Sequence, residues 1–250
     1  MEWESGGYFP AELKFAGYDG LIIEGKSEEP TYLWIKDGKV SFRSASKLMG
    51  TNTIDCQQII KDELKDQNTR VACIGPAGEN LLKIASIINE RRAVGRRGLG
   101  AVMGSKNLKA IAIRGDSPVP LADDEIAREA RSGMLKQMND SPILYSEFSK
   151  HGTPMVTDAL WGIGIFPAKN YTATGEWGPV EKIGALGNAL QKIGSEHCYN
   201  CPVGCSQMKL VKKGPHAGDM SDPEFESMYS LGGQTGNDNL DSIIAADYKT

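Results

Sequence analysis

Thr31 to Arg43 reads TYLWIKDGKVSFR, and this stretch decides the fold of the first half of the chain. Two alternating runs flank Asp37-Gly38, a dipeptide in which both residues tolerate a positive φ, so the pattern predicts a β-hairpin over 31–43. Thr53 to Leu64 predicts a helix, capped by Thr53, that covers one face of a sheet. Further strand-like runs lie on either side of these elements: GLIIEG (20–25), VACIG (71–75) and KAIAIRG (109–115).

Beyond residue 120 the pattern changes, because Pro118 and Pro120 interrupt the chain and strand-like runs become scarce. Acidic residues at 123–125 open a helix, and further helices are predicted at 142–162, 181–193 and 239–249, the last capped by Asn239. The sequence therefore predicts an α+β fold. A β-sheet-rich domain over 1–120 is followed by a mainly α-helical domain over 121–250.

The composition is that of a globular protein. The 250 residues include 28 Lys and Arg against 32 Asp and Glu, and 40% are hydrophobic, which argues against a disordered chain and against a strongly basic nucleic-acid binder. The longest apolar run, Ala159 to Ala168, is well short of the roughly 20 residues that a membrane helix needs. Residues 1–7 lack the basic and apolar regions of a secretory signal, so we expect a cytoplasmic protein with no nucleic-acid or membrane partner.

Three of the five cysteines lie close together, in the sequence HCYNCPVGC at 197–205. Cys198, Cys201 and Cys205 have the spacing Cys-x2-Cys-x3-Cys, which lets three thiolates surround one centre. The spacing favours an iron-sulfur cluster, while a zinc site completed by His216 stays open as an alternative, and a cluster needs a fourth ligand from elsewhere. Cys56 and Cys73, in a predicted helix and strand, are expected to pack as small apolar residues.

A stretch rich in glycine and arginine runs from Arg91 to Lys106. Between Arg91 and Arg114 there are seven Lys or Arg and no acid, so positive charge is concentrated here in a chain of net charge −4. Arginines can hold a phosphate through paired hydrogen bonds, and the glycines at 95, 98, 100 and 104 are predicted to let the backbone approach a ligand. The order of the glycines argues against a Rossmann site, and a solvated basic loop is the alternative to a phosphate-binding loop.

Together these stretches resemble the tungsten-containing aldehyde ferredoxin oxidoreductase family. The resemblance runs along almost the whole chain in one order, and it favours a [4Fe-4S] cluster over zinc. The segments that carry it are Ser5–Lys26, Ile74–Leu81, Arg92–Ile113, Cys198–Cys205 and Pro223–Ser227.

The resemblance implies a tungsten or molybdenum atom held by two pterins, with Mg²⁺ bridging the pterin phosphates and a [4Fe-4S] cluster nearby. Cys198, Cys201 and Cys205 match cluster ligands, and Glu226 matches a glutamate beside the metal, a candidate catalytic proton carrier. An ordinary acid at a helix start is the alternative for Glu226. The positions that match pterin-binding residues are Gly6, Arg92, Ala93, Gly95 and Arg96.

The implied activity is the oxidation of aldehydes to carboxylic acids, with electrons passing through the cluster to ferredoxin. A relative that reduces aromatic (aryl-CoA) thioesters and an inactive or split-gene fragment are the alternatives. Family members are more than twice as long and supply the fourth cluster cysteine later in the chain, so the remainder of the enzyme is an expected partner and the full-length form an expected homodimer. Ala245 stands where the family has a glutamate that helps hold an iron between subunits, so we expect no such bridging iron.

Overall fold

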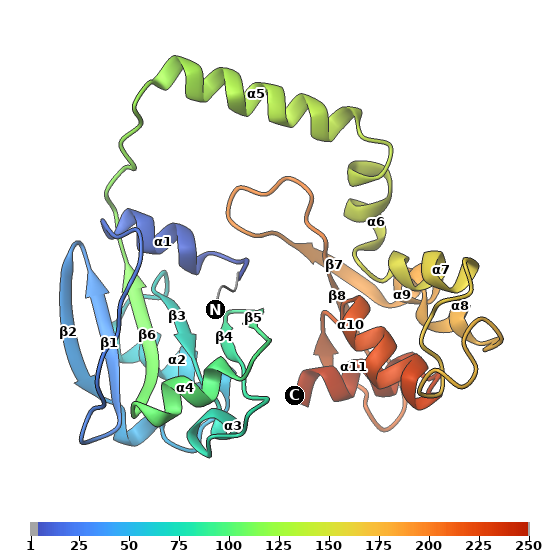
Figure 1. The fold of residues 1–250 in the computed structure, drawn as a ribbon, viewed down its shortest axis with the longest axis horizontal. Helices are drawn as coiled ribbons and strands as arrows, with labels where there is room; N and C mark the ends of the chain where they lie inside the picture. Colours follow the sequence, from blue (N-terminus) through green and yellow to red (C-terminus); the bar gives the residue numbers. More distant parts are fainter. Residues whose placement is uncertain (1–4, 250) are drawn as a thin grey trace. The chain divides into compact units, whose positions relative to one another are not determined.

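The computed structural model describes residues 5–249 and divides the chain into two compact units, Met1–Ala122 and Asp123–Thr250. Figure 1 shows a sheet with helices on its faces in the first unit and mostly short helices in the second. The division falls where a helix begins after the two prolines, and each unit is described by itself below.

Unit 1 is built on a six-stranded sheet with the order β2-β1-β6-β3-β4-β5. All neighbouring strands are antiparallel except β1 and β6, which are parallel. The predicted hairpin is confirmed: β1 and β2 pair with Lys36 opposite Lys39, and Asp37 and Gly38 both have positive φ, at 46° and 77°. The strands are β1 (Thr31–Lys36), β2 (Lys39–Ser44), β3 (Arg70–Cys73), β4 (Ile87–Asn89), β5 (Arg92–Val94) and β6 (Leu108–Arg114).

Helix α2 (Thr53–Leu64) covers one face of this sheet, as predicted. Cys56 and Ile60 are fully buried against Cys73 of β3, so the two isolated cysteines do pack as apolar residues. The predicted cap is wrong by one residue, because the Asn52 side chain, not that of Thr53, accepts the hydrogen bond of the Asp55 N–H at 2.8 Å. The remaining helices of the unit are α1 (Phe9–Phe15), the 3-10 turn η1 (Ser46–Leu48), α3 (Pro76–Glu79) and α4 (Leu99–Ser105).

Two further predictions for unit 1 are wrong. Residues 20–25 do not form a strand: Leu21 and Ile23 pack against the core while Ile22 is 92% exposed, and β1, the next strand along the chain, already has a strand on each side. The stretch from Arg91 to Lys106, expected to be a loop, contains strand β5 and helix α4. Three-residue strands such as β4 and β5 are too short to give an alternating pattern.

Unit 2 is mainly helical, as predicted, but it also contains an antiparallel sheet, β7-β8-β9, that was not predicted. Asn239 caps the last helix as predicted, its Oδ1 accepting from the Ser242 N–H at 3.2 Å. The strands are β7 (Lys192–Glu196), β8 (Ser206–Leu210) and β9 (Met220–Ser221). The helices are α5 (Asp124–Asp140), α6 (Ser149–His151), α7 (Met155–Gly162), α8 (Val180–Ile183), α9 (Ala185–Gln191), α10 (Phe225–Ser227) and α11 (Leu240–Lys249), with π-helical turns η2 (Leu144–Phe148) and η3 (Met228–Gly232) and a 3-10 turn η4 (Gly233–Thr235).

Two helices predicted as continuous are broken in the structure. The one expected over 142–162 is interrupted at Gly152, whose φ of +66° is left-handed, and at Pro154, which has no N–H to donate. The one expected over 181–193 breaks at Gly184 and ends at Gln191. The core of the unit gathers around Phe166, Ile183, Met228, Ile243 and Ile244. None of the helices formed by residues 5–249 combines the length and apolar character of a membrane span.

Candidate functional site

The N-terminal turn lies against the β4–β5 hairpin of unit 1. Asn89 Nδ2 donates to Ser5 Oγ at 2.6 Å, although 84 positions separate the two residues. Gly7 has a φ of +91°, and a Cβ there would lie 2.7 Å from Asn89 Oδ1 and 3.3 Å from Arg92 Cγ. The structure therefore brings the turn that contains Gly6 next to Arg92, which is half-buried.

The other three residues predicted to bind the pterin follow directly. Ala93 lies in β5, and Gly95 and Arg96 lie in the connection from β5 to α4, and all three are exposed. All five predicted cofactor-binding residues thus belong to one region of unit 1, at the edge strand of the sheet. Arg96 can reach an anionic ligand from this edge, and a guanidinium is well suited to hold a phosphate.

The glycines of this stretch have two different functions. A Cβ on Gly98, Gly100 or Gly104 would lie 2.1 Å from Lys83 O, 2.5 Å from Ser86 O or 2.0 Å from Gly78 O. These three glycines let α4 pack closely on the chain at 78–86, so the prediction that they admit a ligand is wrong. Gly95 is different, because the nearest atom to a Cβ there is Ala93 Cβ at 3.7 Å. Of these four glycines, Gly95 is the one whose Cβ would meet its neighbours only at ordinary van der Waals distance.

Asn89 is a polar residue of this region that the sequence analysis missed. Its side chain is almost fully buried, and its Oδ1 has no hydrogen-bond partner among residues 5–249. A buried acceptor without a donor is unfavourable, so a ligand N–H or O–H at this point would stabilise the region. The signal in the sequence is slight: a single asparagine between Ile87-Ile88 and the arginines.

The three clustered cysteines lie in the loop 197–205, which joins β7 to β8 in unit 2. Glu196 pairs with Ser206 at the base of this loop, which we call the cysteine hairpin. The Cys201 N–H donates to Cys198 O at 3.0 Å, and a Cβ on Gly204, whose φ is +60°, would lie 2.4 Å from the His197 ring. The three thiols are half-buried and form no disulfide.

A second segment holds the cysteine hairpin in place. Ser149 Oγ donates to Val203 O at 2.5 Å, and Gln207 Nε2 donates to Gly204 O at 3.0 Å. Gly152 packs so closely that a Cβ there would lie 2.4 Å from Cys205 O. The loop is therefore fixed by backbone contacts on the side of Cys205.

The three thiols are ligands of the kind that both an iron-sulfur cluster and a zinc ion take. Among residues 5–249, no three His, Cys, Asp or Glu side chains are placed to hold a metal ion together. His216 Nδ1 lies 3.7 Å from Asp219 Oδ2. A cluster with several irons separates its thiolate ligands, and three half-buried thiols on a tight loop suit it.

Glu226 lies in α10 of unit 2, which continues directly into η3, and its side chain is exposed. It is an acid in the first turn of a helix, which agrees with the ordinary interpretation as well as with the functional one. The turn is held at Phe225, whose N–H donates to Thr153 Oγ1 at 3.0 Å. Ser149 and Thr153 thus anchor the cysteine hairpin and the Glu226 turn to one short segment.

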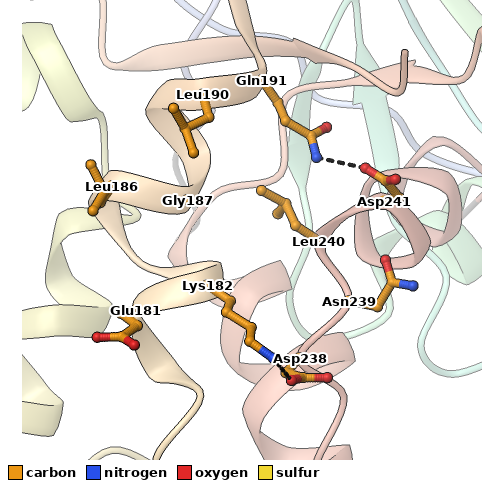
Figure 2. A pocket seen from close by; sticks show the side chains of 10 residues that line it. All are labelled: Glu181, Lys182, Leu186, Gly187, Leu190, Gln191, Asp238, Asn239, Leu240 and Asp241. Carbon is orange, nitrogen blue, oxygen red and sulfur yellow. Dashed lines mark hydrogen bonds and ion pairs between the residues drawn. The ribbon is translucent and has the colours of Figure 1, made fainter. Parts of the chain in front are cut away.

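A groove elsewhere in unit 2 contains none of the predicted site residues. Figure 2 shows it between α8, α9 and the start of α11, with an ion pair of 2.5 Å between Lys182 and Asp238 and a hydrogen bond of 2.5 Å from Gln191 to Asp241. Leu186 and Leu190 are exposed along it. Two of the charged groups of this groove, Lys182 and Asp238, are therefore already paired with each other.

The motifs and the geometry agree with a comparison of the chain with known protein families. The model for the N-terminal domain of aldehyde ferredoxin oxidoreductase matches residues 1–115, and the model for domains 2 and 3 of the same protein matches residues 129–250. The two matches follow each other in the family's order and leave only short stretches uncovered. The chain belongs to the aldehyde ferredoxin oxidoreductase family.

Individual relatives give the same result. The chain is 40% identical over 245 residues to the tungsten-containing aldehyde ferredoxin oxidoreductase of Pyrococcus furiosus and 40% identical over 246 residues to that of Thermococcus kodakarensis. Each match covers 98% of this chain and 40% of the relative, so the chain spans less than half of the length of these proteins. Among solved structures, the active site complex BamBC of benzoyl coenzyme A reductase with 1,5-dienoyl-CoA matches with a TM-score of 0.83 and 29% identity, over 99% of this chain and 39% of that one.

Proposed function

We propose that this chain is part of an oxidoreductase that converts aldehydes to carboxylic acids at a bis-pterin centre holding tungsten or molybdenum. Electrons leave through a [4Fe-4S] cluster to ferredoxin. The observation that carries the proposal is the contact of the Ser5–Gly7 turn with the β4–β5 hairpin, because it unites the separate pterin-matching positions in one region. The names of the 40% identical relatives support the same activity.

In unit 1 the residues of the chain bind and orient the cofactor. Arg92 and Arg96 would hold the pterin phosphates together with Mg²⁺, and Gly95 would let the backbone approach the pterin. Asn89 Oδ1 accepts a hydrogen bond from the cofactor, which satisfies this buried atom. The metal-pterin centre, when bound, supplies the two-electron chemistry.

In unit 2 the residues hold the cluster and move a proton. Cys198, Cys201 and Cys205 supply three thiolates, and the fourth ligand comes from the remainder of the enzyme, which this chain does not span. Glu226 takes up one of the two protons that are released, with two electrons, when an aldehyde and water form a carboxylic acid. The full-length enzyme works as a homodimer in the cytoplasm, without an iron bridging the subunits at Ala245.

The test uses the complete protein, purified without oxygen. Wild type is expected to contain tungsten or molybdenum and iron, and to reduce a viologen dye when an aldehyde is added. E226Q is expected to lower kcat by about 10²–10⁴-fold with a smaller change in KM, since a proton carrier acts in the chemical step. E181Q, at an exposed acid of the same unit, is the matched control and is expected to keep the wild-type kcat.

A second variant tests the cofactor site. R96A is expected to lower the tungsten or molybdenum content, whereas R131A, at an exposed arginine of α5, leaves it unchanged. Full metal content and activity in both E226Q and R96A would refute the assignment of these two residues. Wild type that binds neither metal nor iron would favour the inactive or split-gene alternative.

The reduction of an aromatic thioester is the second candidate, and the match to the benzoyl coenzyme A reductase complex favours it. The two candidates need the same cofactor but opposite directions of electron flow. Dye reduction by an aldehyde supports the first. Oxidation of a reduced dye by an aryl-CoA, with no response to aldehydes, supports the second.

A further inference from the structure

A fully buried lysine contacts the chain just before the Glu226 turn. Lys209 of β8 has no exposed surface, and its Nζ donates to Gln207 O at 2.8 Å and to Pro223 O at 3.2 Å. A buried ammonium is costly unless its environment compensates for the loss of water. Burial lowers the pKa of Lys209 to about 8, and the nearby acids Asp222, Asp247 and Glu224 oppose this shift.

Two of these acids connect the surrounding strands and helices. Asp222 accepts a hydrogen bond from Ser206 Oγ, directly after the last cysteine of the cysteine hairpin. Asp247 of α11 accepts from both Ser221 Oγ and Ser227 Oγ. A single carboxylate therefore holds both ends of the segment 221–227, in which Glu226 is the neighbour of the last residue, Ser227.

Glu226 lies near the start of a helical stretch, because α10 runs directly into the π-helical turn η3. Its side chain is exposed, so packing of that side chain does not fix it. The start of the stretch is held by the Phe225 N–H, which donates to Thr153 Oγ1, and by the contacts of Pro223, Ser221 and Ser227.

We propose that the buried Lys209 and the half-buried Asp222 and Asp247 form a positioning network that fixes the Glu226 turn relative to the cysteine hairpin. Lys209 acts on the turn through Pro223 and on β8 through Gln207, and Asp222 joins the turn to the residue after Cys205. These are positioning residues and do not touch the substrate. The expected effect on catalysis rests on the proposed function of Glu226. The link between the Glu226 turn and the cysteine hairpin does not depend on that function.

The experiment compares hydrogen-deuterium exchange of the complete protein in wild type, K209M and K109M. Lys109 is the matched control, because it is also a fully buried lysine of a β-strand, in the other unit, where it pairs with Glu79. K209M is expected to speed exchange at least tenfold in both peptides 197–206 and 221–227. K109M is expected to leave exchange in these two peptides at the wild-type rate.

A second variant, D247N, keeps the proposal testable if K209M does not fold. It is expected to speed exchange in 221–227 but not in 197–206, since Asp247 holds the serines at the two ends of the turn and none in the hairpin. Unchanged exchange in 221–227 in D247N, or equal effects of K209M and K109M on the two peptides, would overturn the network. A drop in kcat in D247N, with iron content retained, is expected in addition.

The two proposals fail in different ways. If E226Q keeps full activity, Glu226 is not the proton carrier, but the exchange rates still decide whether the network positions the turn. If exchange is unaffected while E226Q is inactive, the proposed function stands and the network is refuted.

Discussion

Gly104 and Gly95 belong to one glycine-rich stretch, yet alanine at the two positions should give opposite results. In Gly104→Ala the new Cβ meets Gly78 O at 2.0 Å and Gly78 C at 2.8 Å, and a backbone carbonyl cannot rotate away. Overpacking costs typically about 1–3 kcal/mol, against a gain of about 1 kcal/mol from replacing glycine within a helix. Because the contact is with backbone, we expect a net loss of about 1–2 kcal/mol.

Gly95→Ala meets no such contact. The nearest atom lies at 3.7 Å, and Gly95 is not among the residues with positive φ, so the substitution should be neutral or raise the free energy of unfolding by about 0.4–1 kcal/mol. It should nevertheless reduce the tungsten or molybdenum content, because the new methyl group fills the space that the cofactor needs.

Thermal unfolding and metal analysis of the complete protein measure both effects. We expect Gly104→Ala to melt several degrees below wild type, and Gly95→Ala to melt at or above wild type with less metal bound. The reasoning is refuted if Gly104→Ala is as stable as wild type. It is equally refuted if Gly95→Ala is less stable than wild type, or keeps its full metal content.

Two further predictions concern stability, and a third concerns the retention of iron. Lys109→Met leaves the Glu79 carboxylate buried without its ion-pair partner and should lower the free energy of unfolding in urea by about 3–5 kcal/mol. Adding Glu79→Gln should recover part of this loss. A loss below about 1 kcal/mol, the size found for exposed ion pairs, would contradict the prediction. Burial, with the neighbouring Glu63 carboxylate, raises the pKa of Tyr32 to about 12. Between pH 10 and about 12 the folded state therefore keeps a proton that the unfolded state loses, so the stability of the protein falls as the pH rises through this range. The melting temperature of Tyr32→Phe should fall less steeply with pH than that of wild type, and an equally steep fall would refute this. In Gly152→Ala the new Cβ would lie 2.4 Å from Cys205 O, on a backbone whose φ of +66° is strained for alanine. The variant should therefore lose iron during gel filtration. An iron content equal to that of wild type would disprove this.

Features set by neighbouring residues could be predicted from the sequence. The 31–43 hairpin follows from Asp37-Gly38, and the cysteine hairpin is visible as three cysteines within eight residues. The fold class and the Asn239 cap of the last helix belong to the same group, although Asn52 takes the capping position expected of Thr53. The family resemblance rests on such local motifs.

Features set by contacts between distant segments could not be predicted in this way. The hydrogen bond from Asn89 to Ser5 joins residues 84 positions apart, and the close approach of Gly104 to Gly78 depends on how α4 packs on α3. The same holds for Lys209, since only the fold shows that a lysine in a buried strand meets the Pro223 carbonyl. Sequence pattern alone assigned to ligand binding three glycines that serve packing.

The central strand of unit 1 is also the last of its strands to be synthesised. Strand β6 lies between β1 and β3 and pairs Leu108 with Thr31 on one side and Ile113 with Arg70 on the other. Closing such distant pairs carries a large loop entropy, which slows folding. On the ribosome the sheet therefore cannot close until residue 114 has emerged, and until then β1 and β3 expose unpaired edges that a chaperone or another nascent chain can bind.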